Sequence, residues 1–149
     1  MKAEKILITP QRAAMTILLI AVALAVLVLL QSRGGVLSAH YNVTTRQGRA
    51  DYLAAQGWTV EPETETAQEI TLPREFTGVL AEYNELQLQQ GFDLRPYGGM
   101  TVTVCTYLVT NYDADSPVLA TLYLYRNRVI AGDIHATAMD GFLHGIRKG

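Results

Sequence analysis

The sequence predicts an α+β protein, in which an N-terminal transmembrane helix precedes one small domain with a mainly antiparallel sheet. Three observations lead to this prediction. Ala13 to Leu30 is an uncharged run rich in Leu, Ile and Val. Beyond it, two segments carry apolar residues at helical spacing. Toward the C-terminus, segments rich in Val, Thr and Tyr follow one another through connections too short for the crossovers that parallel strands need.

The apolar run sets the predicted domain organisation. As a helix rising about 1.5 Å per residue, residues 13–30 would be about 27 Å long, close to the ~30 Å hydrocarbon core of a bilayer. Lys2, Lys5 and Arg12 precede the run and Arg33 alone follows it closely, so the positive-inside rule favours a cytoplasmic N-terminus. We therefore expect a cytoplasmic stub (1–12), a transmembrane signal-anchor helix (13–30), a flexible stalk (31–43) and an extracytoplasmic domain (44–149).

The run has two other interpretations, a cleaved signal peptide and a buried core helix. A cleaved signal peptide usually has a hydrophobic part of about 7–15 residues, which is shorter than this run. Val36-Leu37-Ser38 before Ala39 would nevertheless serve as a cleavage site, so cleavage stays open. A buried core helix would carry a polar stripe, and this run has none. The expected location is the cell membrane, with a single pass and the C-terminal domain outside.

Composition narrows the classes of partner. The chain has 12 Lys and Arg against 14 Asp and Glu, a net charge of −2, and no basic tract. Nucleic acid is therefore not an expected partner, because binding phosphates requires clustered basic residues. Cys105 is the single cysteine and allows no internal disulfide. It lies in a Thr/Val/Tyr segment, which indicates a buried filler rather than a reactive thiol.

The first half of the domain is predicted to contain a helix and two short strands. The helix begins at Thr44, which would form a capping box with Gln47, and ends at Gly57 in the left-handed conformation. Alternation of apolar and polar residues then predicts strands at 58–60 and 68–72, on either side of an acidic loop.

A second helix and three strands follow. Pro73 suits the first turn of a helix, and Gly91 suits its end. One face of this helix is predicted to be apolar and to carry Phe76, Val79, Leu80, Tyr83 and Leu86. Strands are expected at 101–112, 118–125 and 128–136, the last two joined by the turn Arg126-Asn127. The predicted order is α-β-β-α-β-β-β, with two helices on one face of the sheet.

This packing predicts an open sheet face that bears tyrosines. If Leu122, Leu124, Ile130 and Ile134 face the helices, alternation turns their neighbours outward. The residues turned outward are Tyr123, Tyr125, Asp133 and His135. With Tyr107 from the strand before and His144 from the segment after, they form a candidate surface for a ligand, a protein or a cell-envelope partner. The alternative is a solvent-exposed face without a partner, whose residues are there because they favour strand structure.

Catalysis is the weaker hypothesis. Asp133 and His135 lie two apart on a strand, and His144 follows, so the three could hold a metal with an open position, as catalytic zinc requires. Their spacing is not a known metal signature. No serine has the strand–elbow–helix surroundings of a nucleophile. We predict no catalytic residue, metal or cofactor, and we keep a metal-assisted hydrolase using Asp133, His135 and His144 as the alternative.

Five motifs in the domain carry a resemblance to a known family. They are RADYLAAQGWTV (49–60), YNELQLQQGFDL (83–94), Tyr97-Gly98-Gly99, Gly132-Asp133 and GFLHG (141–145), in this order. In this respect the chain resembles an uncharacterised family of Firmicutes extracytoplasmic proteins, domain of unknown function 4830. The resemblance implies a small exported domain behind a membrane or lipid anchor, with no established activity. The chain departs from the pattern in lacking a lipidation cysteine and in having Ala131 where a glycine would be typical.

The predicted function is that of a membrane-anchored extracytoplasmic domain of unknown function that acts as a non-catalytic binding or interaction module. A further option, regulation of a membrane partner through the anchor helix itself, stays open.

Overall fold

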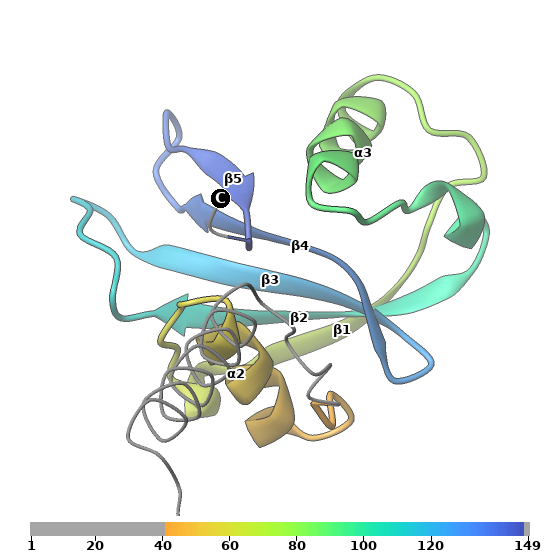
Figure 1. Ribbon diagram of the computed structural model, residues 1–149. Helices are drawn as coiled ribbons and strands as arrows, with labels where there is room; N and C mark the ends of the chain where they lie inside the picture. The colour runs from red at the N-terminus through yellow and green to blue at the C-terminus, as the bar shows by residue number, and fades with distance from the viewer. Residues whose placement is uncertain (1–40, 148–149) are drawn as a thin grey trace, which may run out of the picture. The chain divides into compact units, whose positions relative to one another are not determined.

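The computed structural model describes residues 41–147, which form a five-stranded antiparallel sheet and two α-helices (Figure 1). The helices are α2 (Arg46–Ala55) and α3 (Val79–Gln89), and two short 3-10 turns are η1 (Pro62–Thr64) and η2 (Arg95–Tyr97). The strands are β1 (Thr66–Thr71), β2 (Thr101–Val109), β3 (Val118–Tyr125), β4 (Arg128–Ala136) and β5 (Leu143–Gly145). They lie in chain order, each antiparallel to its neighbours. The predicted α+β class is confirmed for this domain.

The predicted stub (1–12), transmembrane helix (13–30) and most of the stalk (31–43) lie outside the described residues. Among residues 41–147, no helix has both the length and the apolar composition needed to cross a bilayer.

The order of elements differs from the prediction at two places. The expected strand at 58–60 is reduced to a single bridge between Val60 and Val109, and Pro62 begins η1 directly afterwards. The indole of Trp58 is buried and donates a hydrogen bond of 2.6 Å to the carbonyl of Ile146, so this segment packs on the core instead of extending the sheet. The fifth strand is β5, which pairs with β4 and lies beyond the last strand that the sequence predicted.

Both predicted helices are present, with different starts. Thr45, not Thr44, caps α2, because its hydroxyl accepts from the N–H of Gly48 at 3.0 Å. Helix α3 begins at Val79, well after Pro73. Gly78 has φ +56°, which is not helical, and it forces the helix to start after it. The glycines predicted to end the helices, Gly57 and Gly91, are confirmed in these positions, with φ of +92° and +80°.

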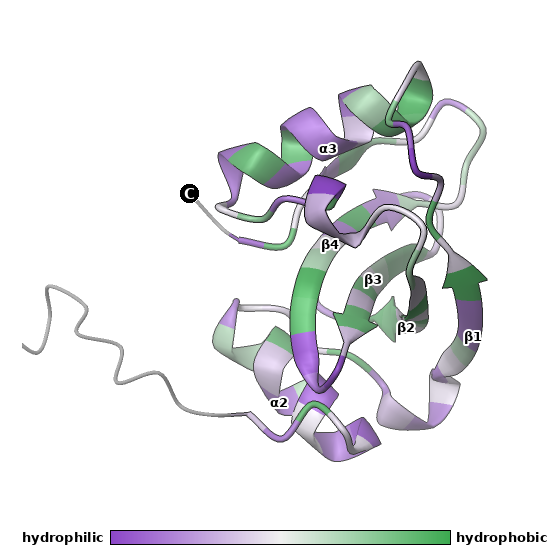
Figure 2. Ribbon diagram, turned by 90° about the vertical axis from the view of Figure 1, so that its right-hand side faces the viewer, coloured by the Kyte–Doolittle hydropathy of each residue, from purple (hydrophilic) through white to green (hydrophobic). Residues whose placement is uncertain are grey.

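The two helices cover opposite faces of the sheet, so the predicted packing on one face is wrong. Leu53 of α2 packs in a buried cluster with Tyr107 and Leu122. Tyr83 of α3 packs in a separate cluster that includes Val104 and Tyr123. Successive residues of a strand point to opposite faces, so the two clusters lie on different sides, and Figure 2 shows α2 and α3 on either side of the sheet. Both faces of the central strands are apolar, and each needs a cover.

A bulge changes the face of one predicted core residue. Tyr123 pairs with Ala131 and Leu124 pairs with Val129, which leaves Ile130 as the extra residue. Ile130 therefore joins the cluster on the α3 face instead of lying beside Leu122.

The hairpin next to this bulge is as predicted. Arg126 and Asn127 have φ of +45° and +61°, the conformation of a two-residue turn whose twist matches the strands. β3 and β4 also have the predicted bounds. Cys105 is the expected buried filler, and burial raises the pKa of its thiol.

Candidate functional site

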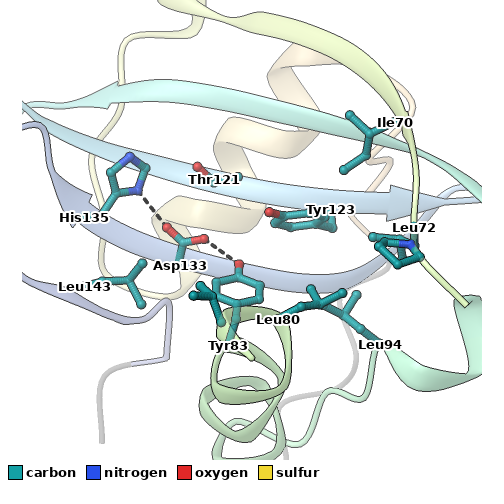
Figure 3. A pocket seen from close by; sticks show the side chains of 12 residues that line it. Ile70, Leu72, Leu80, Tyr83, Leu94, Thr121, Tyr123, Asp133, His135 and Leu143 are labelled. Carbon is teal, nitrogen blue, oxygen red and sulfur yellow. Dashed lines mark hydrogen bonds and ion pairs between the residues drawn. The ribbon is translucent and has the colours of Figure 1, made fainter. Parts of the chain in front are cut away.

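A groove of about 590 Å³ lies between α3 and the face of the sheet that α3 covers (Figure 3). Its lining is mostly apolar and comes from α3, from the segments on either side of α3, and from every strand except β2. The lining residues are Ile70, Leu72, Pro73, Val79, Leu80, Tyr83, Leu94, Thr121, Tyr123, Asp133, His135 and Leu143. Leu72 and Leu94 are buried at its floor. Its volume is in the range of small-molecule sites in proteins.

A chain of three hydrogen-bonded side chains forms the polar end of the groove. The hydroxyl of Tyr83 donates to Oδ2 of Asp133 at 2.5 Å, and Nδ1 of His135 lies 2.7 Å from Oδ1 of the same carboxylate. Asp133 and His135 are two apart on β4 and point to the same face, while Tyr83 reaches them from α3 (Figure 3). Asp133 is only 3% exposed, and both of its oxygens are occupied.

The electrostatics of this chain follow from the buried carboxylate. The hydrogen bond to Asp133 favours the imidazolium and raises the pKa of His135, against the opposing effect of burial. Burial, with the nearby charge of Asp133, raises the pKa of Tyr83 far above its ordinary value, so Tyr83 remains a neutral hydrogen-bond donor. Burial and the same charge raise the pKa of Tyr123.

Nε2 of His135 is the ring nitrogen that Asp133 does not hold. The side chain of His135 is 30% exposed, and no described residue hydrogen-bonds to Nε2. With Nδ1 held by Asp133, Nε2 accepts a hydrogen bond when the ring is neutral and donates one when it is protonated. The groove therefore offers a ligand an imidazole whose orientation is set by the protein.

Exposed apolar side chains surround the entrance of the groove. Val79 is 82% exposed and Leu143 is 52% exposed. Both also line a neighbouring hollow of about 210 Å³, which Glu82, Tyr83 and Leu86 share. Apolar side chains that gather at the rim of a groove are typical of a binding surface.

The structure brings together half of the predicted surface residues. Tyr123, Asp133 and His135 all line the groove. Tyr125 belongs to the same side but lies beyond the groove, where its ring meets Tyr97 edge-on at 5.4 Å. Tyr107 lies on the opposite face, fully buried under α2, and contacts Arg49 and Glu65. Its predicted position on the open face is wrong.

His144 is also separated from the groove. It pairs with Ile134 across β4 and β5, so it faces the α2 side, where it stacks on Phe142 at 5.3 Å. Its Nδ1 lies 2.8 Å from the carbonyl of Gly145. Asp133, His135 and His144 therefore do not form a common ligand set, and within residues 41–147 no three His, Cys, Asp or Glu residues are arranged to hold a metal.

Sequence reasoning missed the helical side of the site. The helical spacing predicts Tyr83 only as part of an apolar stripe, and nothing in the sequence links its hydroxyl to Asp133. The side chains of Gln87 and Gln90 were also overlooked. They are buried and bind the N–H and carbonyl of Gly132 at 2.9 and 3.1 Å. Amide residues spaced by three, Asn84 and Gln87 in α3 and Gln90 directly after it, are the available signal for a buried polar face.

Fold and groove together define a small α+β domain with a ligand-sized groove between a helix and a curved antiparallel sheet. The chain belongs to the family described as Domain of unknown function (DUF4830), whose model matches residues 52–134, more than half of the sequence. This match confirms the family predicted from the motifs, and it includes Tyr83, Tyr123 and Asp133. Comparisons with curated proteins and with solved structures give no match.

Proposed function

We propose that this domain is a non-catalytic binding module, and that its ligand is a small, partly apolar molecule held in the groove between α3 and the sheet. The supporting observation is the combination of an apolar groove of about 590 Å³ with a polar end fixed by Tyr83, Asp133 and His135. Small-molecule sites commonly join a largely apolar lining to a few well-oriented polar groups.

The arrangement of the carboxylate supports binding over metal-assisted hydrolysis. Both oxygens of Asp133 are engaged by neighbouring side chains, so this carboxylate orients His135 and is not free to bind a ligand. His144, the third member of the alternative metal set, packs against aromatic rings on the other face.

Binding can be tested by NMR on the full-length chain labelled at its Ile, Leu and Val methyl groups, with 1-octanol as a neutral amphipathic probe. We expect chemical-shift changes at Ile70, Leu72 and Leu80, which line the groove. Methyl groups of Leu53 and Val118, in the cluster under α2, serve as the internal reference and should not respond.

A matched pair of variants on α3 sharpens this test. Leu80→Gln removes apolar surface from the groove, whereas Leu88→Gln makes the same change on the same helix outside it. Loss of one buried leucine contact should weaken octanol binding roughly tenfold in Leu80→Gln and leave it unchanged in Leu88→Gln. Equal behaviour of the two variants, or no response of the groove methyls, would refute the groove as a binding site.

We further propose that the domain acts outside the cell behind an uncleaved membrane anchor formed by residues 13–30. The support is the uncharged run in that segment and the basic residues before it. Protease added to intact cells should then degrade the domain, and carbonate at high pH should leave the chain in the membrane fraction. A protected domain, or a chain released by carbonate, would contradict the anchor.

A further inference from the structure

We infer that the ligand of the groove is an amphipathic carboxylate, with its apolar part against Ile70, Leu72 and Leu80 and its carboxylate at Nε2 of His135. This inference rests on the proposed function and specifies the chemical class of ligand for the same groove.

The charged groups that line the groove itself favour an anionic head group, while the carboxylate of Glu82 lines the adjoining hollow. The titratable groups that line it are Asp133 and His135 from β4, Tyr83 from α3 and Tyr123 from β3, while β5 contributes only Leu143. Among the described lining residues, the protonated imidazole is thus the available cation. A cationic head group would meet a carboxylate whose oxygens are both taken, beside a ring that is itself inclined to be positive.

The hydrogen bonds of His135 also favour an anionic head group. Because Nδ1 of His135 is bound to Asp133 at 2.7 Å, protonation of the ring places the second N–H at Nε2, at the end of the groove that His135 lines. A carboxylate accepts such a bond, and charge-assisted bonds of this kind are stronger than neutral ones. Thr121, whose side chain lines the same end, offers a hydroxyl next to it.

The dimensions of the groove suit a chain of medium length. It crosses the sheet from His135 on β4 to Ile70 on β1, and these strands are first and fourth in the sheet order. At about 4.8 Å between neighbouring strands, this span is about 14 Å. Octanoate fits that span and is a soluble representative of the class.

Binding of an ionised carboxylate at His135 should be coupled to protonation of the imidazole ring. A neutral His135 presents a lone pair at Nε2, which repels a carboxylate, so an ionised ligand binds together with one proton whenever the free ring is neutral. Octanoate affinity should therefore decrease as the pH rises through the pKa of His135. The affinity of 1-octanol should not change over the same range, because the alcohol can either donate to Nε2 or accept from it.

The test is titration of the methyl-labelled full-length chain with octanoate, 1-octanol and octylammonium at pH 6 and pH 9. We expect octanoate to bind at least about tenfold more tightly at pH 6 than at pH 9. This ratio of affinities corresponds to the free energy of one charge-assisted hydrogen bond. Octanol should be insensitive to pH, and octylammonium should bind less tightly than octanoate at pH 6. His135→Gln should abolish the pH dependence of octanoate binding, while His144→Gln, which alters a histidine on the other face, should retain it.

The outcomes separate this inference from the proposed function. If octanol shifts the groove methyls but octanoate does not, or binds equally at both pH values, the inference is wrong and the binding module stands. Preferential binding of octylammonium, or an unchanged pH dependence in His135→Gln, has the same meaning. If neither octanol nor octanoate shifts the groove methyls, the proposed function is refuted together with the inference.

Discussion

Tyr83 of α3 donates a hydrogen bond of 2.5 Å to Asp133 in the interior of β4, and this bond joins the helix to the sheet at the polar end of the groove. The same carboxylate holds His135. One buried acid thus connects the position of a helix with the orientation of the imidazole that faces the groove.

Tyr83→Phe should destabilise the domain, because it leaves one oxygen of a buried carboxylate without its donor. We expect a decrease in the free energy of unfolding of about 1–3 kcal/mol, measured by urea denaturation of the full-length chain. Tyr125→Phe is the matched control. The Tyr125 hydroxyl bonds no described residue, and the ring contact with Tyr97 is retained, so the change should stay within about 0.5 kcal/mol. Similar losses in both variants would show that the bond to Asp133 contributes nothing specific.

The pKa of His135 should make stability depend on pH. Its pKa is raised in the folded protein above its ordinary value of 6.5, because of the hydrogen bond to Asp133. Because the pKa is higher in the folded state, protonation of His135 stabilises the fold fully when the pH is below the pKa of the unfolded state. This stabilisation is lost as the pH rises through the pKa of the folded state. The stability advantage of the wild type over His135→Gln should therefore be larger at pH 5.5 than at pH 9.

The corresponding direct measurement is an NMR titration of the His135 ring. It should give a pKa above 6.5 in the wild type and a lower one in Asp133→Asn, which removes the negative charge while keeping the shape of the side chain. An unchanged pKa in Asp133→Asn would contradict the role of the carboxylate.

Gln90 and Gly145 should be energetically coupled. A Cβ at Gly145 would lie 2.4 Å from Cδ of Gln90, whose amide binds the carbonyl of Gly132. Gly145→Ala must therefore displace the Gln90 side chain, at a cost of about 1–3 kcal/mol. In the background of Gln90→Ala the same substitution should cost much less, because the obstructing side chain is gone. Additive losses in this double-mutant cycle of unfolding free energies would refute the close contact.

The ion pair beneath α2 should be a major contributor to stability. Arg49 and Glu65 are 11% and 8% exposed, lie 2.7 Å apart and share the hydroxyl of Tyr107. Glu65→Gln leaves a buried guanidinium without its charge partner and should cost about 3–5 kcal/mol. Glu63→Gln removes the exposed partner of Arg46 and should cost less than about 1 kcal/mol. Equal costs in urea denaturation would contradict this distinction.

The same pair predicts a loss of stability in acid. Burial alone raises the pKa of Glu65, but hydrogen bonds from Tyr107 and Arg49 outweigh it and lower the pKa below its ordinary value of 4.5. Because the pKa is lower in the folded state, ionised Glu65 stabilises the fold when the pH is above the pKa of the unfolded state. This contribution is lost as the pH falls through the pKa of the folded state. The difference in stability between the wild type and Glu65→Gln should therefore shrink below about pH 4.5.

Much of the fold could be predicted because its signals are local. Strand-favouring composition and the turns on either side defined β3 and β4 to the residue, positive φ at Arg126 and Asn127 matched the two-residue turn, and glycines marked where both helices end. Alternation along β4 also placed Asp133 and His135, which are two residues apart, on one face. Each of these features depends on residues that are close together in the chain.

The features that define the groove depend on contacts between distant segments, and only the tertiary structure decided them. A sequence with two apolar sheet faces does not state which helix covers which face, and α3 proved to lie opposite α2. That choice turned a face predicted to be open into a groove and supplied Tyr83 as the partner of Asp133. It also left Tyr107 and His144 on the other side, where Tyr107 is buried. The physical reason is that a strand's pattern determines how side chains alternate, whereas the partner of each face is set by packing across the whole domain.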